Sequence, residues 1–295
     1  MLRTILAAVD TKKRDDDVIA NISTLDPSKV GKITLLHVND ERFGKLNISE
    51  EEKQIFEEKQ IFEKAHNDLK ERGFSVEPLV LTGVPFDEIV NEAKKRKVSL
   101  IAAGAGNNPK WKDFLFGETV ERVLQLSSLP VIVCRESDHG SYIFRHLLIG
   151  IDFSNGSYNA VKVVKSIAEQ KLADIEKVTL IHVHEKTTMD LLMRYAAKEQ
   201  IDREISIEKD RLDEICASLS ELGIKEVNAA MSIGRPAEEI INTIKTINPS
   251  LTVIGAQGSG EPSVCRIGAT ALRVAQFAPS SVLVIPTEIT GHAAC

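Results

Sequence analysis

The chain has 295 residues, a formal net charge of −6, and hydrophobic and charged fractions of 43% and 27%. This length predicts about two domains, and the apolar content is enough for folded cores, which excludes a disordered or fibrous chain. The acidic balance excludes a surface that neutralises nucleic-acid phosphates, and the apolar runs are too short to span a membrane, so we expect a cytoplasmic protein that binds neither.

Each half of the chain shows five short apolar runs separated by helical segments. Runs without polar alternation are typical of strands covered on both faces, so this β-α order predicts a five-stranded parallel sheet with helices on both sides. In the first half we expect strands at about residues 3–9, 32–38, 75–81, 99–104 and 130–134. In the second half we expect them at about 146–151, 177–183, 226–232, 251–255 and 281–285.

The motif EKQIFE occurs twice in succession between the second and third strands of the first half. The spacing of four apolar residues there predicts one face of a helix that runs to about Arg72. These residues are Ile55, Phe62, Ala65 and Leu69. We expect this face to pack against the sheet of its own domain; the alternative is an exposed helix that binds a partner.

The two halves are copies of one domain. Ser99–Gly104 aligns with Ser250–Gly255 at an offset of 151 positions, and the offset is 142 to 145 in the first part of each copy. A polar linker with Gly and Ser, Arg135–Ser141, separates the copies. The sequence therefore predicts two tandem Rossmann-like α/β domains, residues 1–139 and 140–295.

The loops that follow the strands hold the candidate binding residues, because open parallel sheets bind ligands beyond the carboxyl ends of their strands. In the second copy, Gly255 and Gly258 are expected to allow a backbone path closed to other residues. Gly268 then begins a helix whose first amides favour a phosphate, and Thr270 adds a hydroxyl. Asp152, after the first strand, could accept hydrogen bonds from adenine or ribose, or could instead cap the next helix.

The first copy has the same frame with different residues. Gly104 and Gly117 keep the spacing, but Asn107 replaces the second glycine and Glu118 puts a negative charge where a phosphate needs a donor. Three aromatic residues of this loop are expected to pack beneath it or against the other domain, in preference to clamping an adenine; they are Trp111, Phe114 and Phe116. We therefore expect the first domain to bind an anion poorly.

With these loops, the chain resembles the universal stress protein family, specifically its tandem two-domain members with an adenine nucleotide alpha hydrolase-like fold. The ATP-binding members carry Gly, two residues, Gly, nine residues, Gly, and then Ser or Thr. Gly255, Gly258 and Gly268 match this pattern, whereas Ala269 lacks the hydroxyl and Thr270 supplies one a position later.

The resemblance implies a set of binding residues for ATP, with or without Mg²⁺, in the second domain. Ile151, Asp152 and Val183 would hold adenine and ribose, Ile254 and Gly255 would flank the base and sugar, and Gly258, Gly268, Ala269 and Thr270 would hold phosphates. The weaker equivalents in the first domain are Asp10, Val38, Gly104 and Gly117. The resemblance further implies that the domains pair through their last strands, Val131–Cys134 and Val282–Ile285, and that a homodimer can form.

These observations favour a non-catalytic stress-response protein that binds an adenine nucleotide mainly in its second domain. A Walker-type phosphate loop is absent, and we expect His182 and His184 to point to opposite faces of their strand, which leaves no catalytic arrangement. The four cysteines lack metal-ligand spacing, so no metal site is expected. The alternatives are slow ATP hydrolysis or autophosphorylation, at Thr270, Ser259 or Ser263, and a scaffold that binds no nucleotide.

Overall fold

A computed structural model describes residues 3–10, 17–42, 48–105, 117–136, 142–258 and 267–288. The described residues form two compact units. The first reaches Tyr142 and includes Glu288, and the second is Ile143–Thr287. The predicted domain boundary between residues 139 and 140 lies outside the described residues.

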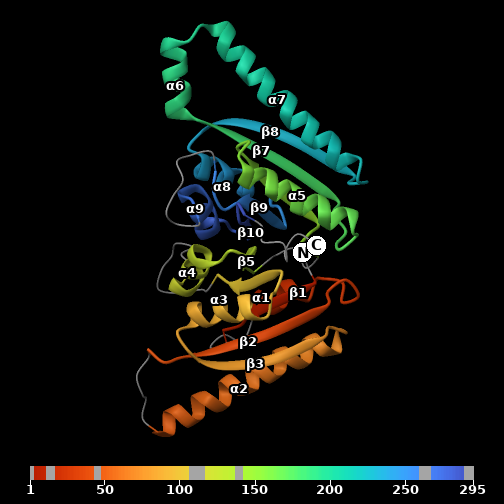
Figure 1. Cartoon of the computed structure of the whole chain (residues 1–295), viewed down its shortest axis with the longest axis vertical. Helices are drawn as coiled ribbons and strands as arrows, with labels where there is room; N and C mark the ends of the chain where they lie inside the picture. Colours follow the sequence, from red (N-terminus) through yellow and green to blue (C-terminus); the bar gives the residue numbers. More distant parts are fainter. Residues whose placement is uncertain are drawn as a thin grey trace. The chain divides into compact units, whose positions relative to one another are not determined.

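The first unit alternates strands and helices along the chain (Figure 1). Its elements are β1 (Thr4–Ala8), α1 (Asp17–Ile22), β2 (Lys32–Asp40), α2 (Ile48–Glu71), β3 (Val76–Gly83), α3 (Pro85–Lys95), β4 (Leu100–Gly104), α4 (Glu118–Leu126) and β5 (Val131–Cys134). All its strand pairs are parallel, in the order β3-β2-β1-β4-β5.

The second unit repeats this plan. Its elements are β6 (His146–Ile151), α5 (Asn155–Glu169), β7 (Lys177–Glu185), α6 (Lys186–Tyr195), α7 (Lys198–Ser220), β8 (Glu226–Gly234), α8 (Pro236–Ile247), β9 (Leu251–Gly255), α9 (Ala269–Phe277) and β10 (Ser281–Ile285). The strands are again parallel, in the order β10-β9-β6-β7-β8. The predicted α/β class with two parallel five-stranded sheets is confirmed.

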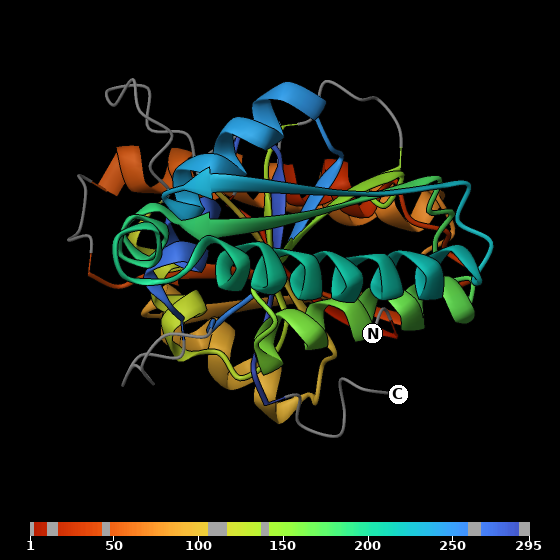
Figure 2. The same cartoon turned by 90° about the horizontal axis from the view of Figure 1, so that it is seen from above.

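Helices cover both faces of the sheet in the second unit. Figure 2 shows α7 and α8 on opposite sides of β7 and β8. The consecutive residues Leu147, Leu148 and Ile149 of the central strand β6 are all buried, which requires cover on both faces. The predicted link between unbroken apolar runs and two-sided burial is thus confirmed.

The predicted amphipathic helix is α2, which ends at Glu71. Phe62, Ala65 and Leu69 are buried, as expected for a face that packs within its own unit. The side chain of Ile55, the fourth predicted member of this face, lies outside the described residues.

The segment between β7 and β8 differs from the prediction. Both strands run two residues further than expected, to Glu185 and Gly234, and two helices rather than one connect them. The break between α6 and α7 falls at Ala196 and Ala197, which have extended backbone angles. Neither glycine nor proline marks this break in the sequence, so the usual signal for the end of a helix is missing.

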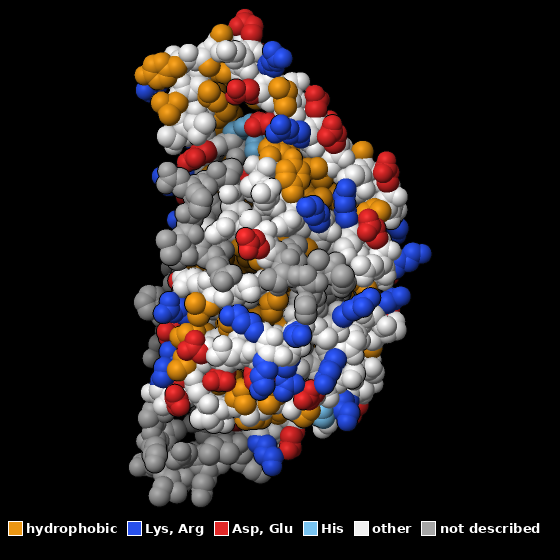
Figure 3. All heavy atoms as spheres, in the orientation of Figure 1, with side chains coloured by type: hydrophobic (Ala, Val, Ile, Leu, Met, Phe, Trp, Pro, Cys, Tyr) orange, Lys and Arg blue, Asp and Glu red, His pale blue; other side chains and the backbone are white. Residues whose placement is uncertain are grey.

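Helix α6 exposes an apolar surface. Figure 3 shows hydrophobic side chains gathered over it, and Leu191, Met193 and Tyr195 are all more than half exposed. Among the described helices, none is long and apolar enough to cross a membrane.

Candidate functional site

The candidate site lies at the carboxyl ends of β6 and β9 in the second unit. The chain leaves β6 toward β7 on one side of the sheet and leaves β9 toward β10 on the other. The strand order therefore reverses between β6 and β9, and this reversal is where open parallel sheets bind ligands.

The loop after β6 is fixed by hydrogen bonds from its own residues. The Ser154 backbone N–H and hydroxyl both donate to Oδ1 of Asp152, over 3.1 and 2.6 Å. Ser154 also caps α5, because its hydroxyl oxygen accepts from the Ser157 N–H at 3.2 Å. Ser154 and not Asp152 therefore caps α5, and Asp152 holds Ser154 in place through one carboxylate oxygen.

The other oxygen of Asp152, Oδ2, faces the loop after β9. A Cβ atom added at Gly258 would lie well inside van der Waals contact with this oxygen. The backbone at Gly258 can therefore approach the carboxylate only because the residue has no side chain. This contact brings the predicted adenine-ribose residue Asp152 and the predicted phosphate residue Gly258 together.

The glycines after β9 are required by close approach rather than by unusual backbone angles. Among the described glycines, the positive φ values are at Gly73 and Gly223, not at Gly255 or Gly258. Gly255 and Gly258 therefore follow a backbone path closed to other residues, as predicted, but through close approach and not through positive φ values. A Cβ atom at Gly255 would collide with the backbone of Gly156, at 2.7 Å from its carbonyl oxygen.

The start of α9 is open to an anion. Gly268 is the N-cap, and no described side chain caps the helix there. Its own N–H donates to the Ala256 carbonyl at 2.7 Å, which holds the helix terminus against the β9 loop. Ala269 is exposed, Thr270 is partly exposed, and the first turn contains no acidic residue. The amides of this turn and the helix dipole therefore favour a negative group.

The remaining predicted residues of this unit, Val183, Ile151 and Ile254, could contact a ligand mainly through their backbone. The pairing of β6 with β7 ends at Ile151 and His182, so Val183 lies one residue past the end of β6, where its main chain can reach a ligand. The side chains of Ile151 and Ile254 are only 4% and 6% exposed. Ile254 lies against Gly150 in the core, so only its backbone is placed to flank a base.

The equivalent edge of the first unit is looser and more acidic. A Cβ atom at Gly104 would make only an ordinary contact, 3.6 Å from Val18. Gly117 begins α4, and Glu118 follows in the first turn, where it accepts a hydrogen bond from Arg42 at 3.1 Å. A carboxylate of the protein therefore already lies at the helix terminus that would receive a phosphate.

The other predicted residues of the first unit are only partly described. Asp10 is exposed and Val38 is partly buried. Asn107 and the aromatic residues of the loop lie outside the described residues, as do Ser259 and Ser263 of the second unit.

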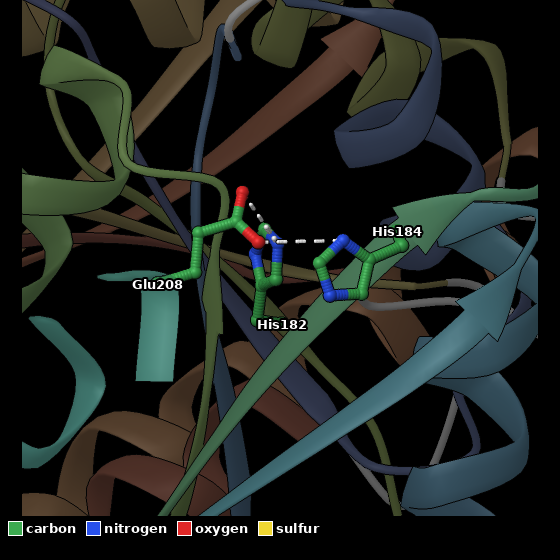
Figure 4. A group of neighbouring side chains, drawn as sticks. All are labelled: His182, His184 and Glu208. Atoms are coloured by element: carbon green, nitrogen blue, oxygen red, sulfur yellow. Dashed lines mark ion pairs between the residues drawn. The ribbon is translucent and has the colours of Figure 1, made fainter. Parts of the chain in front are cut away.

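His182 and His184 point to the same side of β7, and the prediction that they point to opposite faces was wrong. Residues two apart on an extended strand share a face. Both rings approach Glu208 of α7, with His182 Nε2 at 3.8 Å and His184 Nδ1 at 3.5 Å from its carboxylate oxygens (Figure 4). Sequence reasoning missed this cluster because it misassigned the faces and because Glu208 comes from a distant element.

Burial is the main influence on the His184 imidazole and lowers its pKa below the ordinary value. The Glu208 carboxylate opposes this shift, and His182 adds to it. The imidazole of His184 is therefore favoured in its neutral form at neutral pH.

Two α/β units, each with a parallel sheet and helices between its strands, define a tandem pair of Rossmann-like domains. The model of the universal stress protein family matches residues 1–135 and 143–286. The chain belongs to this family, and the resemblance inferred from its glycine spacing is confirmed.

Individual relatives agree with this assignment. The chain is 28% identical to the universal stress protein MJ0577 of Methanocaldococcus jannaschii over 158 residues, which cover 98% of that protein and 47% of this chain. It is 36% identical over 73 residues to YxiE of Bacillus subtilis, covering 49% of that protein and 25% of this chain. A crystal structure of a universal stress protein from Archaeoglobus fulgidus has a similar fold, with a TM-score of 0.71, 22% identity, and coverage of 97% of this chain and 96% of that one.

Proposed function

We propose that this protein is a non-catalytic stress-response regulator that binds an adenine nucleotide, ATP with Mg²⁺ in particular, in its second unit. One observation carries the proposal: the β9 loop lies against both Asp152 and the uncapped terminus of α9. Asp152 would bind the ribose or adenine, and the first turn of α9, with Thr270, would bind the phosphates. Val183 would meet the adenine edge through its main chain.

The two units differ in a way that supports one site rather than two. The first turn of α9 has no acidic residue, whereas α4 begins with Glu118 and also carries Glu121. A triphosphate at α4 would meet like charges, which weakens binding. We therefore place the nucleotide in the second unit and assign the first unit a structural role.

The family resemblance extends the proposal to assembly. We infer that the units pair through β5 and β10 and that two chains can form a homodimer, which sedimentation of the purified chain tests. We also propose that the protein acts in the cytoplasm, because its apolar runs are too short to span a membrane.

Calorimetric titration of the full chain with ATP and Mg²⁺ tests the proposal. We expect saturable binding of one nucleotide per chain. Gly258→Ala should weaken it strongly, because the added methyl group meets Oδ2 of Asp152. Gly117→Ala is the matched control at a helix start in the first unit, where an added Cβ has no described neighbour within 4 Å.

Several results, from the titration and from assays of phosphate release and protein mass, would count against the proposal. Absence of saturable heat at millimolar ATP would favour a scaffold that binds no nucleotide. Equal losses in Gly258→Ala and Gly117→Ala would show that the site is not in the second unit. Steady release of phosphate, or a mass increase from phosphorylation at Thr270, would show that the protein is an enzyme.

A further inference from the structure

His182, His184 and Glu208 form a cluster of metal-ligand type that the nucleotide site does not use. One nitrogen or oxygen atom from each residue can be chosen so that all three atoms lie within 4.8 Å of one another. Figure 4 shows the Glu208 carboxylate directed at both imidazole rings, and the two rings are 4.7 Å apart between centroids. The cluster is therefore compact enough to surround a single ion.

The hydrogen bond of His182 fixes which of its nitrogens is available. Its Nδ1 lies 2.8 Å from the Ile151 carbonyl oxygen, which can only accept, so Nδ1 carries the proton. In the neutral ring, Nε2 then presents a lone pair to the Glu208 carboxylate at 3.8 Å. Two acceptors that face each other favour a cation between them, which can be a proton or a metal ion. A carbonyl that holds the far nitrogen of a histidine is also the usual support of a metal-bound imidazole.

His184 also has ring nitrogens that could bind a metal ion. Its Nδ1 faces Glu208, while its Nε2 is buried without a hydrogen-bond partner among the described residues. The side chains of His182, His184 and Glu208 are 8%, 11% and 28% exposed, so the cluster is largely enclosed but open to solvent through Glu208. Figure 3 shows histidine side chains at the surface between α6 and α7, next to an acidic group.

The first unit contains the same frame with one ligand changed. His37 lies near the Val9 carbonyl through Nδ1, at 3.4 Å, and near Glu58 through Nε2, at 3.7 Å, as His182 does near Ile151 and Glu208. Asn39 takes the position of His184, and its side-chain amide pairs with Nε2 of His37 at 3.1 Å. In the first unit, the amide oxygen of Asn39 thus lies beside this nitrogen, where the second unit places a second imidazole. Among the described residues, the three-ligand set occurs in the second unit.

We infer that His182, His184 and Glu208 bind a zinc-type divalent transition metal ion. Two imidazoles and one carboxylate are the ligands that zinc takes in open sites, with the fourth position left for water or another ligand. At bond lengths of about 2.0–2.2 Å, neighbouring ligands of a tetrahedral ion are about 3.4 Å apart. The two histidine–carboxylate separations, 3.8 Å to Oε1 and 3.5 Å to Oε2, are near this value. The three ligand atoms lie within 4.8 Å of one another, so an ion would draw the side chains closer together. Mg²⁺ prefers oxygen ligands, so this site is distinct in chemistry from a magnesium–nucleotide site.

Metal binding to the untagged full chain tests this inference. After removal of metal with a chelator, equilibrium dialysis should show one Zn²⁺ bound per chain at low micromolar free metal. Co²⁺ should give the visible absorption of a four- or five-coordinate ion without the charge-transfer band of thiolate ligands, which separates this site from binding by cysteines.

Two variants and a control locate the metal. His184→Asn installs the side chain that the first unit carries in the same frame, so the variant is expected to fold, as its circular dichroism will show. It should lose the bound Zn²⁺ and the Co²⁺ spectrum, and Glu208→Gln should do the same. His66→Asn, which removes a partly exposed histidine of α2, should bind metal like the wild type. Wild-type protein that binds neither ion, or folded His184→Asn that retains the Co²⁺ spectrum, would overturn the inference.

Discussion

Substitution of one glycine at equivalent places in the two units should have opposite effects on stability. Gly255 ends β9 and Gly104 ends β4, 151 positions earlier in the chain. A Cβ atom at Gly255 would lie 2.7 Å from the Gly156 carbonyl oxygen and 2.8 Å from the Ser157 nitrogen. A Cβ atom at Gly104 would meet only the tip of Val18, at an ordinary 3.6 Å. The same methyl group is therefore excluded in one unit and accommodated in the other.

The structure sets the size of the expected difference. Overpacking costs about 1–3 kcal/mol, and Gly255→Ala should reach the upper end because the opposing atoms are backbone and cannot rotate away. Gly104→Ala should stabilise by about 0.5 kcal/mol, since alanine restricts the unfolded chain more than glycine does. The two variants should thus differ by about 3.5 kcal/mol in the free energy of unfolding. For a domain of this size, that difference corresponds to about 10 °C in Tm.

Urea unfolding, combined with hydrogen exchange resolved by mass spectrometry, measures this difference. Because the two units can unfold separately, a single transition cannot be assumed, and exchange must locate the loss. We expect Gly255→Ala to lose protection in α5 and β9, while Gly104→Ala leaves all segments protected. Equal stability of the two variants, or a loss of protection confined to the first unit, would refute the argument from close backbone approach.

Three further predictions concern single side chains. Asn39→His should give the first unit the ligand set of the second and raise bound Zn²⁺ from one to two per chain; a stoichiometry of one would mean that this exchange is not what separates the units. Ser154→Ala should destabilise the second unit by about 1 kcal/mol through loss of the α5 cap, measured by urea unfolding, and an unchanged midpoint would contradict that role. Hydrogen bonds from Lys95 and then Arg96 lower the pKa of buried Glu92 below its ordinary 4.5. The charged carboxylate therefore contributes to the free energy of unfolding above pH 4.5, and this contribution is lost as the pH falls through the lowered pKa. Glu92→Gln should therefore cost about 1.5 kcal/mol at pH 7 and progressively less below pH 4.5, whereas a cost independent of pH would show that the charge is not responsible.

The sequence predicted the central strands well because they are buried on both faces, whereas most residues of the edge strands β3 and β8 are exposed or half-buried. Unbroken apolar runs such as the one before Asp152 placed all ten strands to within about two residues, and the constant offset showed that the plan repeats. The ends of β7 and β8 were less predictable, since they extend beyond the neighbouring strands with mixed polarity. The division between α6 and α7 was missed because nothing but two alanines marks it.

Sequence reasoning proposed the residues of the candidate site but not the contacts that explain why glycine is needed there. Glycine spacing identified Gly255 and Gly258, yet the need for glycine comes from contacts with Gly156 and Asp152, which are about a hundred positions away in the chain. Such contacts depend on the packing of α5 against the β9 loop, which no local pattern encodes. For the same reason, no local pattern predicted that Glu208 would meet the two histidines of β7.

The hydrogen bond between the His182 ring and the Ile151 carbonyl has a thermodynamic consequence. Ile151 immediately precedes Asp152, so one bond of 2.8 Å joins the proposed metal ligand to the loop of the proposed nucleotide site. We expect an ion that shifts the His182 ring to shift the Ile151 carbonyl with it, and so the position of Asp152. Linkage is reciprocal, so a metal that changes nucleotide affinity by some factor must have its own affinity changed by the same factor when nucleotide binds. Titrating each ligand in the presence of the other would then measure the same coupling free energy twice. With such coupling, the occupancy of each site would depend on the concentrations of both the metal and the nucleotide.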